Sequence, residues 1–147
     1  MTQSHLASRI VLADDDPDDR LIAADAFREG RLANPLDLVC DGEELLEYLE
    51  RRGRYADRLT AQPGLILLDL NMPRMDGREA LAAIKDNTEL RRIPVVVLTT
   101  SKAEEDLLRT YDLGVNSFCV KPVTFAGLVA LVKDLDHYWF SVVTLSQ

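Results

Sequence analysis

The stretch Gly64-Leu65-Ile66-Leu67-Leu68-Asp69-Leu70-Asn71-Met72-Pro73-Arg74-Met75-Asp76-Gly77 contains an unbroken apolar run that leads into a carboxylate. A short apolar run bounded by turn residues is typical of a strand that is buried on both faces. Gly64 before the run and Pro73 after it favour a strand over a helix. Because ligands of open α/β sheets bind beyond the carboxyl ends of the strands, Asp69 is placed for chemistry.

Apolar and amphipathic segments alternate along the rest of the chain. Short apolar segments predict strands at 9–14, 36–40, 65–69, 95–99 and 117–120. Helices are expected to begin at Pro17, after Gly42 and after Gly77, and two more are expected at 103–113 and 124–140. Asp16 is the expected N-cap of the first helix, and Gly30 is expected to end it. Strands that alternate with helices predict a parallel sheet with helices on both faces.

The composition is that of one acidic globular domain. The 147 residues carry a formal net charge of -8, which argues against nucleic acid as a direct partner because phosphate binding needs clustered Lys and Arg. No apolar run approaches the roughly 20 residues that span a bilayer, and the first residues lack a signal-peptide core. We therefore expect a single cytoplasmic domain over 1–147, with its core at about 8–140 and a short tail.

Two other features have plain structural interpretations. Cys40 and Cys119 each fall in an expected strand, and they are interpreted as buried, reduced thiols. The long connection at 51–63 is polar and contains Gly and Pro, so it is expected to be a surface loop.

Polar residues suited to phosphoryl chemistry follow the expected strands, at the edge where the strand ends converge. They are Asp14, Asp15 and Asp16 at the carboxyl end of the first strand, Asp69 at that of the third, Thr99 and Thr100 at that of the fourth, and Lys121 at that of the fifth. A carboxylate cluster is costly without a cation, and oxygen ligands without His or Cys suit Mg²⁺ or Mn²⁺. A lysine and a hydroxyl would bind the remaining phosphoryl oxygens. Each residue alone has a structural explanation, but together they indicate phosphoryl transfer onto an aspartate.

These strand-end residues resemble those of the receiver domain of the two-component response-regulator family. The resemblance rests on Asp14-Asp15, on the segment 67–73 with Met75-Asp76-Gly77, on the segment 94–99 and on Lys121-Pro122. It covers about residues 8–140. It implies a flavodoxin-like receiver fold, which is a doubly wound five-stranded parallel sheet of order 2-1-3-4-5 with five helices. It also implies a signalling switch in the cytoplasm rather than a turnover enzyme.

The family resemblance implies a role for each site residue. Asp69 would be the phosphoacceptor, and a sensor histidine kinase would be the donor. The phosphoryl group would contact Lys121 and the hydroxyl of Thr99. The ligands of Mg²⁺ would be carboxylate oxygens of Asp15 and Asp69, the backbone carbonyl of Asn71 and, mostly through a metal-bound water, Asp14.

The resemblance also implies a conformational switch. Phe118 occupies the position of the family's switch aromatic, which is often Tyr, so a switch here would work by a rotamer change. Thr100 occupies a position where the family prefers Ala or Gly, and its bulk would narrow access to Asp69. Phosphorylation would repack the face formed by the helix at 103–113, the strand at 117–120 and the last helix.

The last expected helix is more apolar than one buried face requires. The stripe expected to face the sheet consists of Phe125, Leu128, Val132, Leu135 and Trp139. Further apolar residues flank this stripe, which predicts a homodimer through the same face, unless the tail at 142–145 folds back over it. The segment 136–145 and the long polar loop are similar to single-domain regulators that are paired with phytochrome-type histidine kinases. That likeness implies a bacterial phytochrome as the kinase.

Other functions fit parts of the pattern. A haloacid-dehalogenase-like phosphatase also uses a strand-end aspartate and Mg²⁺, but that class requires a second aspartate two residues later, where this chain has Asn71. An adaptor of the same fold that is never phosphorylated would not need the complete acidic site. A dinucleotide-binding domain is disfavoured because no Gly-rich turn follows the first strand.

Overall fold

The computed structural model describes residues 9–30, 34–69, 77–99, 117–122 and 124–134, except for the side chains of Thr99, Ser117 and Phe118. The elements in chain order are β1 (Ile10–Ala13), α1 (Pro17–Glu29), β2 (Leu36–Val39), α2 (Gly42–Glu50), η1 (Gly53–Tyr55), β3 (Leu65–Asp69), α3 (Gly77–Asp86), η2 (Leu90–Arg92), β4 (Val95–Thr99) and β5 (Ser117–Val120). The described part of the last helix, called the C-terminal helix below, covers 125–134. The helix expected at 103–113 lies outside the described residues. None of the described helices has the length and apolarity needed to cross a membrane.

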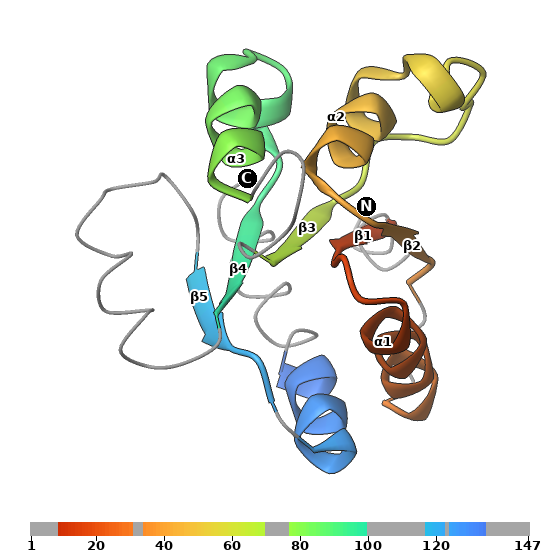
Figure 1. Cartoon of the computed structure of the whole chain (residues 1–147), viewed down its shortest axis with the longest axis vertical. Helices are drawn as coiled ribbons and strands as arrows, with labels where there is room; N and C mark the ends of the chain where they lie inside the picture. Colours follow the sequence, from red (N-terminus) through yellow and green to blue (C-terminus); the bar gives the residue numbers. More distant parts are fainter. Residues whose placement is uncertain (1–8, 31–33, 70–76, 100–116, 123, 135–147) are drawn as a thin grey trace, which may run out of the picture.

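The strands form one parallel sheet in the order β2-β1-β3-β4-β5 (Figure 1). The central strands β1 and β3 are buried along their whole length, as their continuous apolar sequences predict. The register pairs Ala13 with Leu68 and Asp69 with Leu98, so that β1, β3 and β4 end at the same edge of the sheet. The predicted doubly wound fold and its strand order are confirmed.

Alternate residues of the central strands point into two separate cores. Val11 and Ala13 of β1 pack with residues of α2 and α3, whereas Ile10 and Leu12 pack with α1 and the C-terminal helix. Figure 1 shows α2 and α3 on one face of the sheet, and α1 with the blue C-terminal helix on the other. Both α1 and the C-terminal helix begin at the edge where the strands end, so their first turns adjoin the candidate site.

Both ends of α1 are fixed by specific contacts. The carboxylate of Asp16 accepts hydrogen bonds from the backbone N–H groups of Asp18 and Asp19, which confirms Asp16 as the N-cap. Gly30 ends the helix as predicted, with a φ of -74° that any residue could adopt. Its small size matters for another reason, because an added Cβ would lie 2.9 Å from Cγ1 of Val132. Gly30 therefore allows the C-terminal helix to approach α1 closely.

The segment 51–63 lies on the surface, but α2 holds it in place. Arg58 donates from Nε and Nη2 to the carbonyl oxygen of Tyr48, at 3.0 and 2.7 Å. Gln62 donates to the carbonyl oxygen of Leu49 at 2.6 Å. These carbonyls belong to the last turn of α2, where they have no partner within the helix. The guanidinium of Arg58 also lies 4.1 Å from the centre of the Tyr48 ring. The segment thus caps α2 and leads directly into β3.

Replacing Arg58 with Ala is expected to lower the free energy of unfolding by about 2 kcal/mol, because several hydrogen bonds to a charged donor are lost together. Urea denaturation followed by far-UV circular dichroism measures this change. Arg52→Ala is the matched control, since Arg52 is exposed and pairs only with Glu50 in the described contacts. Arg52→Ala is expected to lower the free energy of unfolding by less than about 1 kcal/mol. Equal effects of the two variants would contradict the capping role of Arg58.

The two cysteines differ in part from the prediction. Both are free thiols, but both are half-buried rather than buried, and Cys40 follows β2 instead of lying within it. The physical reason is the strand order, which places β2 and β5 at the two edges of the sheet. A residue at a sheet edge is covered by neighbouring strands on one side only.

Candidate functional site

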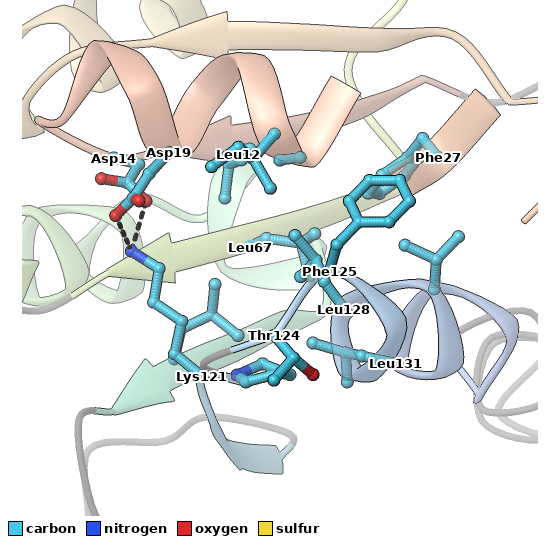
Figure 2. Close-up of a pocket in the computed structure, with 15 residues that line it drawn as sticks. Leu12, Asp14, Asp19, Phe27, Leu67, Lys121, Thr124, Phe125, Leu128 and Leu131 are labelled. Carbon is cyan, nitrogen blue, oxygen red and sulfur yellow. Dashed lines mark hydrogen bonds and ion pairs between the residues drawn. The ribbon is translucent and has the colours of Figure 1, made fainter. Parts of the chain in front are cut away.

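The ammonium group of Lys121 lies at the centre of a cluster of ion pairs at the carboxyl edge of the sheet. Its Nζ atom is 2.6 Å from Oδ2 of Asp14, 2.8 Å from Oδ2 of Asp19 and 3.3 Å from Oδ2 of Asp69. Figure 2 shows the Lys121 side chain extending from the end of β5 toward Asp14 and Asp19. One lysine therefore contacts three carboxylates, which come from the end of β1, the first turn of α1 and the end of β3.

The parallel strands deliver Asp14 and Asp69 to neighbouring positions. Oδ1 of Asp14 accepts the backbone N–H of Asp16 at 3.0 Å, and Arg20 donates to the backbone carbonyl of Asp14 at 2.7 Å. These bonds fix the turn between β1 and α1. The side chain of Asp14 is 2% exposed and that of Asp69 is 10% exposed. Of these two carboxylates, Asp69 is the one that an incoming reactant reaches more easily.

The electrostatics of the cluster keep Lys121 charged. Burial by itself would lower the pKa of the Lys121 ammonium, because the charged form is poorly solvated there. Hydrogen bonds to Asp14 and Asp19, together with the charges of Asp14 and Asp69, outweigh burial and raise this pKa above its ordinary value. Lys121 is therefore a permanent cation at physiological pH, available to neutralise negative charge at the site.

The acidic side chains can also share a metal ion. Asp14, Asp15 and Asp69 each offer a carboxylate oxygen, and these oxygens all lie within 4.8 Å of one another. Asp14 and Asp69 are buried, while Asp15 is exposed. The donors are hard oxygen atoms, which suit Mg²⁺ or Mn²⁺. A single lysine cannot balance this many carboxylates, so the donor set fits a divalent cation.

Asp19 belongs to this cluster, although it was not among the site residues predicted from the sequence. Acids in the first turn of a helix are favoured by the helix dipole, which is a sufficient reason for Asp18 as well as for Asp19. A finer signal was present in the sequence. Asp19 stands four residues before Ala23 and seven before Ala26, which are both buried, so it shares their face of the helix. That face turns the carboxylate of Asp19 toward Lys121.

Several expected site residues are only partly covered by the structure. Asn71 and Thr100 lie outside the described residues. Thr99 ends β4 and Phe118 lies within β5, and the backbone alone is described for both. The residues that the structure does bring together are Asp14, Asp15, Asp69 and Lys121.

Known proteins are similar to this chain in both sequence and fold. The family model of the response regulator receiver domain matches residues 10–133. The response regulator Rcp1 of Synechocystis sp. is 38% identical over 136 residues, which are 92% of this chain and 91% of Rcp1. The structure of the phosphorylated cyanobacterial phytochrome response regulator RcpA is 40% identical, with a TM-score of 0.79, and the match covers 92% of this chain and 95% of RcpA. The Mn²⁺-bound form of Rcp1 is 36% identical, with a TM-score of 0.77 and coverage of 92% and 96%.

The family match and the site geometry agree with each other. The matched region contains the strand ends that carry Asp14, Asp15, Asp69 and Lys121, and the whole described sheet lies within it. The identities exceed one third over nearly the whole chain, and the structural relatives have the same fold. The chain belongs to the response regulator receiver domain family, whose members work in phosphorylation-based signalling.

Proposed function

We propose that the protein is a single-domain response regulator that accepts a phosphoryl group on Asp69 from a sensor histidine kinase. One observation carries the assignment of the acceptor. Asp69 is the more accessible of the two buried strand-end carboxylates, and its Oδ2 lies 3.3 Å from the Lys121 ammonium. A nucleophile for phosphoryl transfer needs such access together with a neighbouring cation. The domain would span 1–147, with its core at about 8–140.

The proposed reaction forms an acyl phosphate. A carboxylate oxygen of Asp69 attacks the phosphorus of a phosphohistidine, the P–N bond breaks, and the imidazole leaves with the electron pair and takes up a proton. The Lys121 ammonium donates hydrogen bonds to the phosphoryl oxygens and balances their charge. Thr99 would add a hydroxyl donor at the end of the neighbouring strand. The chain contributes position and charge rather than turnover, so we do not expect a multiple-turnover enzyme.

Mg²⁺, or Mn²⁺, is the proposed cofactor. Asp15 and Asp69 would hold the ion directly, Asp14 would bind mostly through water, and the backbone carbonyl of Asn71 would complete the protein ligands. When bound, the ion supplies charge neutralisation for the phosphoryl oxygens. Support comes from the three carboxylates within 4.8 Å and from the Mn²⁺-bound form of the relative Rcp1.

The proposed partners follow from the relatives rather than from any contact in this chain. RcpA is a phytochrome response regulator, which supports a bacterial phytochrome as the histidine kinase. The proposed location of the protein is the cytoplasm. We further propose that Thr99 and Phe118 transmit phosphorylation to a homodimer face formed by 103–113, β5 and the C-terminal helix. The net charge of -8 disfavours nucleic acid as a partner.

Two alternatives make different predictions. A haloacid-dehalogenase-like phosphatase would turn over small phosphate esters, but the family match and Asn71 both argue against it. An adaptor that is never phosphorylated would take up no phosphate. The Lys121 ammonium beside Asp69 favours the phosphorylated switch over this adaptor, because a scaffold does not need a half-buried cation at a carboxylate.

Phosphorylation by acetyl phosphate tests the proposal. The intact mass of the protein is expected to increase by one phosphoryl group in the presence of Mg²⁺ and to stay unchanged when EDTA removes the metal. Absence of any added mass with Mg²⁺ present would favour the adaptor. Continuous release of phosphate from small esters would favour the phosphatase instead.

A further inference from the structure

The contact between Asp19 and Lys121 has no part in the reaction proposed above. Asp19 reaches Lys121 from α1, and its side chain is 38% exposed. Both residues lie at one end of a cavity of about 200 Å³ between α1 and the C-terminal helix (Figure 2). The walls shown beyond them are mainly apolar, with Leu12, Phe27 and Leu128 among them. Asp19 thus reaches Lys121 from α1, whereas the acceptor Asp69 reaches it from the end of β3.

The number of donors on the lysine limits what it can contact. An ammonium group has three N–H donors. In this structure Asp14, Asp19 and Asp69 accept from Lys121 at 2.6, 2.8 and 3.3 Å. A phosphoryl group on Asp69 can take over the contact that Asp69 already makes, but any second hydrogen bond from Lys121 requires it to displace Asp14 or Asp19. Of the three contacts, the one with Asp19 ties the ammonium to α1, and the one with the acceptor Asp69 is the longest.

We propose that Asp19 is a positioning residue that holds the Lys121 ammonium on the α1 side and competes with the phosphoryl group for it. The inference rests on the proposed function of Asp69. The pair between Asp19 and Lys121 favours the unphosphorylated arrangement, because the phosphorylated arrangement weakens it. Removing the Asp19 carboxylate leaves Asp14 as the one remaining competitor among the three carboxylates described around Lys121, so the ammonium can move closer to Asp69. The site then binds a phosphoryl group more tightly, not less.

Beryllofluoride tests the proposal because it binds a carboxylate oxygen through beryllium and imitates a bound phosphoryl group. Its affinity is measured by NMR titration at saturating Mg²⁺ in the wild type and in Asp19→Asn. The expected result is binding about three- to tenfold tighter in the variant, which is the scale of a half-exposed ion pair. Asp18→Asn is the matched control, because Asp18 lies in the same helical turn, is exposed and loses the same charge. The affinity of Asp18→Asn for beryllofluoride is expected to stay within about twofold of the wild-type value.

A double-mutant cycle checks that Asp19 acts through Lys121. Urea unfolding without metal compares Asp19→Asn in the wild-type background and in a Lys121→Met background. The destabilisation by Asp19→Asn is expected in the first background and not in the second. Absence of this coupling would overturn the inference. So would an affinity of Asp19→Asn for beryllofluoride that is equal to, or lower than, that of Asp18→Asn. Failure of the wild type to bind beryllofluoride would instead count against Asp69 as the acceptor.

Discussion

Asp69→Asn is expected to lower the incorporation of phosphate from acetyl phosphate by on the order of a hundredfold or more, because the amide is a poor nucleophile. The side chains have nearly the same size, and Asp69 is the last residue of the buried strand β3, so the sheet should be retained. The measurement is the fraction of protein that carries one added phosphoryl group in intact-mass spectra. A melting temperature from circular dichroism confirms that the variant is folded.

Asp16→Asn provides the matched control for this experiment. Asp16 also follows a strand, but its carboxylate caps α1 by accepting from the backbone of Asp18 and Asp19. Asn is an equally good N-cap, so α1 should remain intact. Phosphorylation of Asp16→Asn is expected to stay close to that of the wild type. Equal phosphorylation of the two variants would show that another residue accepts the phosphoryl group.

Lys121→Met is expected to lower the free energy of unfolding by about 3 kcal/mol in metal-free buffer at neutral pH, because removing one partner leaves buried charge uncompensated. Asp14, whose side chain is 2% exposed, loses its contact with the ammonium. Met keeps the length of the side chain without its charge. Added Mg²⁺ should restore part of the stability, since the same carboxylates then have a cation. The variant should also be phosphorylated more slowly than the wild type.

The pH dependence of this effect follows from the raised pKa of Lys121. A folded-state pKa above the ordinary value of 10.5 gives a contribution to stability that is complete below 10.5 and is lost as pH rises through the folded-state pKa. The difference between wild type and Lys121→Met should therefore be constant near neutral pH and shrink above about pH 10.5. Lys133→Met, which alters an exposed lysine of the C-terminal helix, should have little effect. If both variants were equally stable, the proposed role of Lys121 would be wrong.

Much of the fold could be predicted because hydrophobic pattern and turn residues agree in this chain. The run from Leu65 to Leu68, with Gly64 before it, predicted β3, and the structure has the same strand. Asp16 and Gly30 marked the two ends of α1. The length of a loop does not reveal its internal contacts, which is why the capping of α2 by Arg58 was not predicted. Its guanidinium binds backbone carbonyls, which carry no sequence signal.

The candidate site could be predicted where it depends on strand ends and not where it depends on the direction of a helical side chain. Four of the predicted residues lie at the carboxyl ends of strands whose order brings them to one edge, and they are Asp14, Asp15, Asp69 and Lys121. Asp19 was missed because its position in a first helical turn had a sufficient explanation in the helix dipole. The exposed fraction of Phe125, 47%, also differs from the prediction that it faces the sheet, whereas Val132 of the same stripe is buried. Phe125 lies in the first turn of its helix, beside the cavity.

The most direct test of the central claim locates the phosphoryl group on the chain. Borohydride reduces an aspartyl phosphate to homoserine, which marks the acceptor permanently. The wild type is phosphorylated by acetyl phosphate with Mg²⁺, reduced, digested and sequenced by tandem mass spectrometry. We predict homoserine at position 69 and at no other aspartate. Homoserine at position 14, 15 or 19, or its complete absence from a protein that has gained the phosphoryl mass, would contradict the assignment of Asp69 as the phosphoacceptor.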